Sequence, residues 1–335
     1  MTSDKVPATR VALLVTPKFN LAATMAFIDP LRAVNYLDAQ KHFSWQLVSV
    51  DGGLQTASNG LQLNTTALAD VDREQYDLVI VSSSWTPELY SDRRLSQALR
   101  FWSRRGLTLG AIDTGAFILA QAGLLNDRQA TVHYEHLDAF IELFPKVHSS
   151  EQLCVFDGDR ISCAGGNATV DFSLHIVVSR CGEMIANKAA QYLFQQSLRP
   201  LSASQNANNS LPLGSAVPNL VRNAIAVMEQ HLENPLSLVA VCKHVGVSQR
   251  QLARLFSQYV GKTPVRYYLD IRLDRARGLV TQTVMPLSQV AVASGFASEV
   301  HFSRAYKKRF ALAPNKDRIE GRVPFEFRAW PMHKV

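Results

Sequence analysis

The sequence predicts two domains of different fold class: an α/β domain with a doubly wound parallel sheet, followed by an all-α domain with two helix-turn-helix motifs. The chain has 335 residues, enough for two domains at about 150 residues each. Before residue 199, short apolar runs alternate with helical patterns, as in a parallel sheet covered by helices on both faces. After residue 218, every segment has helical periodicity.

The α/β domain is expected over residues 8–198. Its expected strands cover 10–16, 43–50, 77–82 and 107–112, and a short hairpin pairs 152–156 with 160–163. Its expected helices cover 21–37, 87–104, 115–122, 169–180 and 184–196. An open sheet of this kind binds ligands beyond the carboxyl ends of its strands, so the residues that follow each strand are the first candidates for a site.

A stretch with almost no charge follows the α/β domain. Residues 199–217 are rich in Ser, Asn and Pro and lack hydrophobic periodicity, so we interpret them as a flexible linker. The all-α domain is then expected over 218–318 and a C-terminal tail over 319–335. Long amphipathic helices are predicted at 218–232 and 263–282.

An internal repeat lies on either side of the second long helix, because residues 235–256 match residues 285–306. Each copy predicts a short helix, a turn carrying Gly (Gly246 or Gly295), a Ser at an N-cap position and a second helix. This pattern is typical of a helix-turn-helix, in which the start of the second helix meets the edges of DNA bases.

Charge also separates the two domains. Residues 216–335 hold 18 Lys and Arg against 8 Asp and Glu, whereas the rest of the chain holds 17 against 20. A basic module joined to a nearly neutral one indicates a polyanionic partner for the basic module alone. A solvated cationic surface is the alternative that charge by itself leaves open.

Composition argues against several protein classes. Hydrophobic residues make up 47% and charged residues 19%, a balance typical of globular proteins. No apolar run approaches the roughly 18 residues of a membrane span, and residues 1–10 lack the apolar core of a signal peptide, so we expect a cytoplasmic protein. The four cysteines form no CxxC pair, which disfavours a disulfide framework and a zinc site.

Residues 218–318 resemble the DNA-binding domain of the AraC family of transcription regulators. The resemblance rests on residues 236–256, on the run Gly261-Lys-Thr-Pro-Val-Arg-Tyr-Tyr and on Phe302-Ser-Arg-Ala-Tyr. The chain departs from the family at Ala313-Pro-Asn-Lys-Asp-Arg, where a Ser-Pro-x-x-x-Arg finish is usual. The resemblance implies two recognition helices that enter successive major-groove segments of double-stranded DNA.

Side chains on the open face of the two recognition helices are the candidates for DNA contact. The expected base contacts are Gln249, Arg250, Arg254, Glu299, Val300, His301 and Arg304, because these residue types can bond or touch base edges. The expected phosphate contacts are Arg266, Lys307, Lys308 and Arg309. A merely solvated helix face remains the alternative, above all for Glu299 and His301.

In the first domain, the run from Leu107 to Phe117 predicts a strand, a tight turn and a helix, with Asp113 at the corner. With Thr131-Val-His-Tyr-Glu-His and Cys163-Ala-Gly-Gly, this run resembles the flavodoxin-like domain of the class I glutamine-amidotransferase-like superfamily, which includes the PfpI proteases. More closely, it resembles regulators that carry such a domain ahead of an AraC-type module. The catalytic relatives have Cys at the corner.

The residue at the corner argues against catalysis, because a carboxylate cannot replace a thiolate in acyl transfer. We therefore expect a regulator and not an enzyme. Two alternatives stay open: an amidase or hydrolase fused to a DNA-binding tail, and an architectural DNA-binding protein whose first domain only dimerises.

The corner is instead expected to form a ligand site. Its candidate residues are Asp113, Trp85, His133, Tyr134 and Ser83. A carboxylate beside aromatic rings suits a small cation, and the resemblance points to amino acids or quaternary amines as inducers. The alternative role for Trp85 is packing in the core, and the alternative role for Asp113 is capping the helix that follows it. No metal or cofactor is expected, because the His133-to-His136 run lacks HExxH spacing.

The expected partners follow from this reading. They are operator DNA, a small nitrogen-containing inducer, a second copy of the chain and RNA polymerase, with activation as the expected sign of regulation. The sequence does not indicate a membrane partner.

Overall fold

The structure is a computed structural model, and it describes residues 8–87, 90, 92–195, 198–205 and 217–320. The chain divides into two compact units, which meet in sequence between Gln205 and Asn206. Each unit is described by itself.

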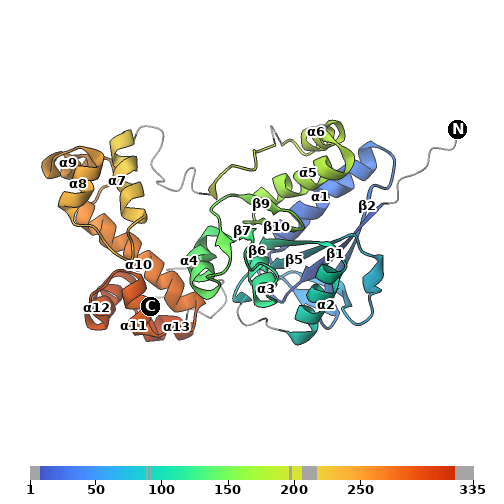
Figure 1. The fold of residues 1–335 in the computed structure, drawn as a ribbon, viewed down its shortest axis with the longest axis horizontal. Coiled ribbons are helices and arrows are strands. Elements are labelled where there is room, and N and C mark those ends of the chain that lie inside the picture. Colours follow the sequence, from blue (N-terminus) through green and yellow to red (C-terminus); the bar gives the residue numbers. More distant parts are fainter. Residues whose placement is uncertain (1–7, 88–89, 91, 196–197, 206–216, 321–335) are drawn as a thin grey trace. The chain divides into compact units, whose positions relative to one another are not determined.

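The N-terminal unit is built on an eight-stranded sheet with the order β3-β4-β2-β1-β5-β6-β10-β9 (Figure 1). The central strands are parallel, and only the edge pairs β3–β4 and β9–β10 are antiparallel. The strands are β1 (Thr9–Val15), β2 (Phe43–Ser49), β3 (Gly53–Thr56), β4 (Gln62–Ala67), β5 (Leu78–Ser83), β6 (Thr108–Asp113), β9 (Cys154–Asp157) and β10 (Arg160–Cys163). A separate two-stranded sheet pairs β7 (Gln129–Ala130) with β8 (His148–Ser149).

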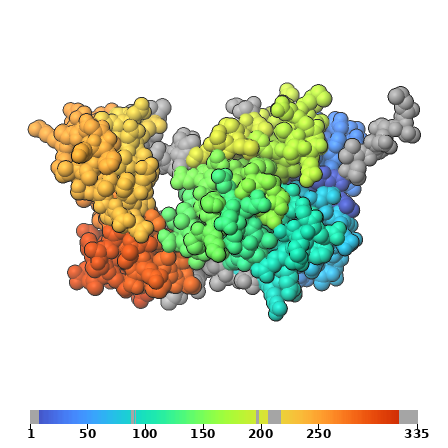
Figure 2. All heavy atoms as spheres, in the orientation of Figure 1, coloured from blue at the N-terminus to red at the C-terminus, as the bar shows by residue number. Residues whose placement is uncertain are grey.

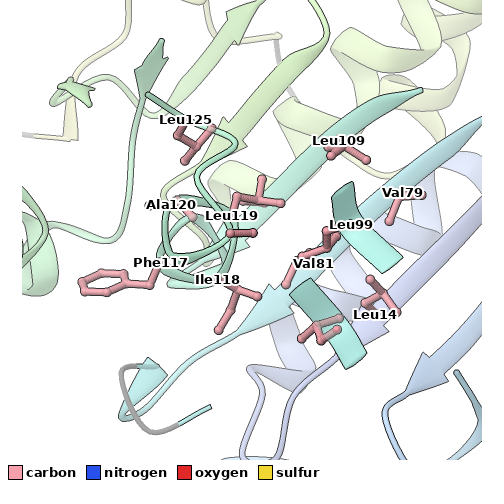
Figure 3. Close-up of a cluster of buried hydrophobic side chains, with 14 of the residues drawn as sticks. Leu14, Val79, Val81, Leu99, Leu109, Phe117, Ile118, Leu119, Ala120 and Leu125 are labelled. Atoms are coloured by element: carbon pink, nitrogen blue, oxygen red, sulfur yellow. The ribbon is translucent and has the colours of Figure 1, made fainter. Parts of the chain in front are cut away.

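Helices cover both faces of this sheet because its strand residues are apolar on both sides. In β1, Val11 and Leu13 belong to one core, whereas Ala12 and Leu14 belong to the other. The first core is closed by α1 (Leu21–Leu37), α5 (Ala168–Cys181) and α6 (Glu183–Tyr192). The second is closed by α2 (Arg93–Arg104), α3 (Gly115–Gln121) and α4 (Tyr134–Leu143). Figure 3 shows side chains of α2 and α3 against Leu14, Val79, Val81 and Leu109 of the sheet.

The C-terminal unit contains only helices among its described residues. They are α7 (Asn219–Glu229), α8 (Leu238–Val245), α9 (Gln249–Tyr259), α10 (Pro264–Gln282), α11 (Leu287–Ala293), α12 (Glu299–Phe310) and α13 (Pro314–Glu320). The long helix α10 lies between two helical groups (Figure 1), which form the yellow-to-orange and the red surfaces of this unit in Figure 2. It contributes to both cores, with Tyr268 in the first and Leu273 in the second.

The predicted fold class is confirmed, and most of the predicted elements appear with their ends shifted by one or two residues. The helix expected over 87–104 is an exception, because α2 begins at Arg93 behind the N-cap Asp92. The helix expected over 184–196 ends at Tyr192. The sequence patterns did not predict β3, β4, β7, β8, α4 or the 3-10 turn Arg73–Gln75.

The linker interpretation does not hold for its first residues. Residues 199–205 belong to the N-terminal unit, where Ala203 and Gln205 form backbone hydrogen bonds with Leu153 and Glu151. Residues 206–216 and the tail from 321 onward lie outside the described residues. Among the helices that the structure does describe, none is long and apolar enough to cross a membrane.

Candidate DNA-binding surface and ligand site

The first helix-turn-helix is formed by α8 and α9. Gly246 ends α8 in the left-handed conformation with φ +71°, and the Ser248 hydroxyl caps α9 by accepting from the Gln251 N–H at 3.2 Å. Leu252 and Phe256 are fully buried between the two helices and α7. Their burial fixes which face of α9 remains open to solvent.

The second helix-turn-helix repeats this construction with α11 and α12. The Ser298 hydroxyl accepts from the His301 N–H at 3.2 Å, and Phe302 and Tyr306 are fully buried. Gly295 adopts φ +73°, and a Cβ there would lie 2.5 Å from the carbonyl oxygen of Leu232. Only glycine therefore fits this turn, because both the conformation and the close backbone approach exclude a side chain.

The two turn glycines make a matched pair for a stability measurement. We expect Gly295→Ala to destabilise the protein by about 2–4 kcal/mol, because it combines a left-handed backbone with a backbone clash. Gly246 has nearly the same φ, but a Cβ added there would meet open space. Gly246→Ala should therefore lower the free energy of unfolding by only about 1 kcal/mol. Urea unfolding monitored by circular dichroism would measure both, and equal losses would show that the close approach to Leu232 does not matter.

All seven residues predicted to contact bases are exposed on α9 and α12. Among the described residues, the guanidinium groups of Arg250, Arg254 and Arg304 form no ion pair, so they can reach a partner outside the unit. Val300 is 61% exposed at the start of α12, a position that an apolar side chain has no internal reason to occupy. These placements agree with direct base contact, which remains a proposal.

The predicted phosphate contacts divide into two groups. Lys307 and Lys308 are exposed on α12. Arg309 instead binds inward, 2.7 Å from Asp270 and 2.6 Å from Asp274, and its guanidinium lies over the Phe310 ring. The phosphate assignment of Arg309 is therefore withdrawn, because two carboxylates already hold its charge.

Arg266 shares this arrangement, since it lies 3.2 Å from Asp270 with its side chain 43% exposed. The carboxylate of Asp270 is buried and also pairs with Lys262 at 2.8 Å. Burial alone would raise its pKa, but Lys262 and Arg309 outweigh burial and hold the pKa of Asp270 below its usual range. Asp270 thus ties the turn before α10 to the end of α12.

A second polar attachment fixes the turn of the second motif. Arg272 of α10 donates to the carbonyl oxygens of Ser294 and Gly295, and its guanidinium lies 4.5 Å from the centre of the Phe296 ring. Tyr268 holds the segment between α7 and α8, since its hydroxyl donates to His231 O at 2.7 Å and accepts from Leu236 N at 3.2 Å. Sequence reasoning did not assign Asp270 or Tyr268 these roles, because the pattern of α10 shows helical periodicity but not its partners.

The candidate ligand site is centred on Asp113, at the carboxyl end of β6. Asp113 adopts φ +62° in the tight turn before α3, a strained conformation for a residue with a side chain. The turn at Gly165 packs closely against it, since a Cβ there would lie 3.0 Å from the Asp113 Cβ. The backbone therefore presents this carboxylate at the corner that the sequence predicts.

The carboxylate of Asp113 is 5% exposed, and the Asn20 amide donates to it at 2.9 Å. Burial raises the pKa of Asp113 to about 6, while the charge of His133 and the hydrogen bond from Asn20 lower it in part. Glu135 also faces the carboxylate and raises its pKa. An anion held in this way lacks a full countercharge, which is a property of functional sites.

The other predicted ligand residues are placed differently around this corner. Ser83 pairs directly with Asp113 in the sheet, but it is fully buried and accepts a hydrogen bond from Thr16 at 2.8 Å. Trp85 and His133 both pack on the ring of His136, each with ring centres 6.3 Å apart. Asp113, His133 and Ser83 therefore lie around one corner.

His133 and Tyr134 lie at the start of α4, where His133 is the N-cap, and they follow β7 of the separate two-stranded sheet. Tyr134 is 50% exposed and stacks on His133 with ring centres 4.5 Å apart. Sequence reasoning missed Asn20, although a polar residue after the first strand is a signal that could have revealed it.

A cavity of about 230 Å³ lies beside this corner, at the carboxyl ends of β1 and β2. It is lined by Thr16, Ser49, Asp51, Gln55 and Tyr90 among others, and by none of the five predicted ligand residues. Thr16 connects the two places, since its hydroxyl contacts Ser83. Among the described residues, no three His, Cys, Asp or Glu side chains are grouped as a metal site requires.

Comparison with known proteins matches both units. The family model of the DJ-1/PfpI family covers residues 9–179, and a helix-turn-helix domain model covers residues 241–319. The solved AraC family transcriptional regulator from Pseudomonas putida is 26% identical with a TM-score of 0.51, and covers 55% of this chain and 99% of that one. The HTH-type transcriptional regulator CdhR of Pseudomonas aeruginosa is 37% identical over 305 residues, which are 91% of this chain and 90% of that protein. The chain belongs to the AraC-type transcriptional regulators that carry an N-terminal DJ-1/PfpI domain.

Other relatives agree with this membership. The HTH-type transcriptional regulator GlxA of Rhizobium meliloti is 32% identical over 93% of this chain and 96% of that protein. The sequence resemblance to AraC-type regulators with a PfpI-like domain is thus confirmed, as is the fold class. A DNA-binding helix-turn-helix unit follows from membership, whereas the individual contacts of this AraC-type regulator do not.

Proposed function

We propose that the chain is a ligand-responsive activator of transcription, in which the N-terminal unit senses a small nitrogen-containing metabolite and the C-terminal unit reads operator DNA. The observation that carries the DNA part is the pair of capped helices α9 and α12, each with an exposed Arg on its open face. Two such helices on one rigid unit suit successive major-groove segments.

The ligand part rests on Asp113. Its carboxylate is buried, hydrogen-bonded to the neutral Asn20 amide and the Thr114 backbone N–H, and acted on by the charges of both His133 and Glu135. A small cation or zwitterion would supply the missing countercharge, and Trp85 beside His136 offers an aromatic surface to an ammonium group. This supports an amino acid or quaternary amine as inducer.

Catalysis by the amidotransferase route is disfavoured by the residue at the corner. Asp113 stands at the position where the catalytic members of the superfamily have a nucleophilic Cys. Cys154 and Cys163 are buried with their sulfurs 3.8 Å apart, and burial together with Cys163 raises the pKa of the Cys154 thiol. A buried thiol with a raised pKa is a poor nucleophile. The fused-hydrolase alternative therefore lacks a reactive residue at the corner.

DNA binding is expected to reside in the C-terminal unit alone. A fragment of residues 216–335 should shift duplex DNA in a gel assay, because it contains both helix-turn-helix motifs and the net positive charge. A fragment of residues 1–205 should not shift the same DNA at any concentration tested. A shift by the N-terminal fragment, or none by the C-terminal one, would contradict the proposal.

We also propose that the regulator acts as a homodimer, because paired half-sites lengthen its contact with DNA. Sedimentation at micromolar concentration should give twice the monomer mass of 37.1 kDa. A monomer both with and without DNA would refute the dimer.

A thermal-shift screen of small amines, betaines and amino acids on residues 1–205 tests ligand sensing, and a stabilised fragment is the expected result.

A further inference from the structure

The segment after α6 lies against the N-terminal unit, where Ser204 forms a single antiparallel bridge with Gln152. We call residues 198–205 the docked arm; in Figure 1 they follow α6 along the chain. Leu153 N donates to the carbonyl oxygen of Ala203 at 2.7 Å, and Gln205 N donates to that of Glu151 at 2.8 Å. The arm therefore extends the edge of the fold beside β9.

The beginning of the docked arm is fastened by Arg199 to one side of the Asp113 corner. Its guanidinium lies 2.6 Å from the buried carboxylate of Asp171 in α5, and its backbone N–H donates to the same carboxylate at 3.0 Å. A further guanidinium N–H donates to the carbonyl oxygen of Asn167 at 3.0 Å. Asn167 lies in the turn that Ala168 N closes by donating to Gly165 O at 3.2 Å, and Gly165 packs against Asp113.

The end of the docked arm is fastened by Gln205 to the other side of the corner. Its side-chain amide donates to Val132 O at 2.9 Å and to Thr131 Oγ1 at 3.0 Å. Val132 immediately precedes His133, whose charge acts on the Asp113 carboxylate. The arm thus bridges the two segments that enclose Asp113.

We propose that the docked arm responds to the state of the Asp113 site at the point where the chain leaves the N-terminal unit, with Gln205 as the positioning residue of this coupling. The inference rests on the proposed function and adds its route of regulation. A ligand that changes the spacing between the Gly165 turn and His133 must shift both attachments of the arm, and linkage makes the effect reciprocal. The Gln205 bonds are neutral and weaker than the charged Arg199 bonds, so this end should release first.

The coupling can be tested in the full-length chain without a known ligand. Hydrogen-exchange mass spectrometry should follow the peptides 131–136 and 198–205 in wild type, Gln205→Leu and Asp113→Asn. We expect Gln205→Leu to speed exchange in 131–136 by about fivefold or more, and Asp113→Asn to change exchange in 198–205 by a similar factor. The midpoint of the pH dependence of stability assigned to Asp113 should also move upward in Gln205→Leu, because His133 is no longer held in place.

Ser204→Ala is the matched control within the arm, because the Ser204 hydroxyl donates to Glu151 O at 3.3 Å and Glu151 lies outside the 131–136 peptide. This substitution should leave the exchange rates of both peptides within about twofold of their rates in wild type. If Gln205→Leu fails to fold, Gln205→Asn shortens the same amide and takes its place. If Gln205→Leu speeds exchange in 198–205 alone, and leaves the exchange of 131–136 and the pH midpoint unchanged, the coupling is overturned. A gel shift on the same samples separates the coupling from the proposed function. If the wild-type chain fails to bind DNA, only the proposed function is refuted.

Discussion

Replacing Arg254 and Arg304 together by alanine is expected to abolish sequence-specific DNA binding while the chain stays folded. Both side chains are exposed on recognition helices and form no ion pair with another described residue, so their replacement removes no internal ion pair of the described chain. A bidentate Arg–guanine pair contributes about 1–3 kcal/mol of discrimination, so the double variant should lose about 2–6 kcal/mol on its operator. On an unrelated duplex its affinity should fall far less.

Competition binding against a selected operator and a random duplex, at two salt concentrations, would measure this effect. Lys307→Ala and Lys308→Ala serve as controls, because each should weaken binding to every sequence and lower the salt slope by about one. Equal losses on operator and random DNA for the arginine variants would place Arg254 and Arg304 among the phosphate contacts instead.

Much of this surface could be predicted from the sequence, because the signals are local. Ser248 and Ser298 are N-caps in the structure as their spacing predicts, and the buried faces of α9 and α12 follow from apolar periodicity. Arg309 shows where local reasoning ends. A basic residue at the end of a recognition helix predicts a phosphate contact, but Asp270 and Asp274, distant in sequence, hold its guanidinium.

The ligand site shows the same limit more strongly. The strand–turn–helix pattern predicts Asp113 at the corner, and the register of β5 and β6 places Ser83 beside it. The amide of Asn20 comes from 93 residues away. Its place after the first strand marks Asn20 as a candidate, but nothing in the sequence shows that it pairs with Asp113. The docked arm could not be predicted either, because an uncharged stretch of Ser, Asn and Pro predicts a linker whether or not its backbone forms hydrogen bonds with another segment.

Asp113→Asn is expected to stabilise the folded chain at neutral pH. Burial raises the pKa of Asp113 to about 6 from an ordinary value of 3.8. The folded chain therefore holds this proton more tightly than the unfolded chain, so stability falls as the pH rises from about 4 to about 6. Above that window the free energy of unfolding is lower by about 3 kcal/mol. Asparagine carries no charge, so the variant does not lose this stability.

Urea unfolding of wild type and Asp113→Asn between pH 3.5 and 8 would measure this difference, which should vanish near the lower limit. Asp171→Asn is an informative contrast. Asp171 is equally buried but paired with Arg199 at 2.6 Å, so Asp171→Asn should destabilise the chain by about 1–3 kcal/mol, because the charged bonds to Arg199 are lost while the half-exposed guanidinium stays hydrated. Parallel pH profiles for wild type and Asp113→Asn would show that the Asp113 carboxylate is not the group that titrates.

The same substitution is expected to weaken a cationic inducer at least about tenfold, because the unbalanced buried charge that destabilises the free protein is what attracts the ligand. In wild type the proton and the ligand compete for one carboxylate, so affinity should fall about tenfold per pH unit below pH 6. In Asp113→Asn it should stay flat. Calorimetric titration with trimethylglycine and L-arginine would measure both, with DNA binding by residues 216–335 as the control that must not change. A normal response in the variant, or a neutral sugar or aromatic acid as the best ligand, would remove Asp113 from the ligand site, since a sugar has no charge for Asp113 to balance and an aromatic acid is an anion that Asp113 would repel.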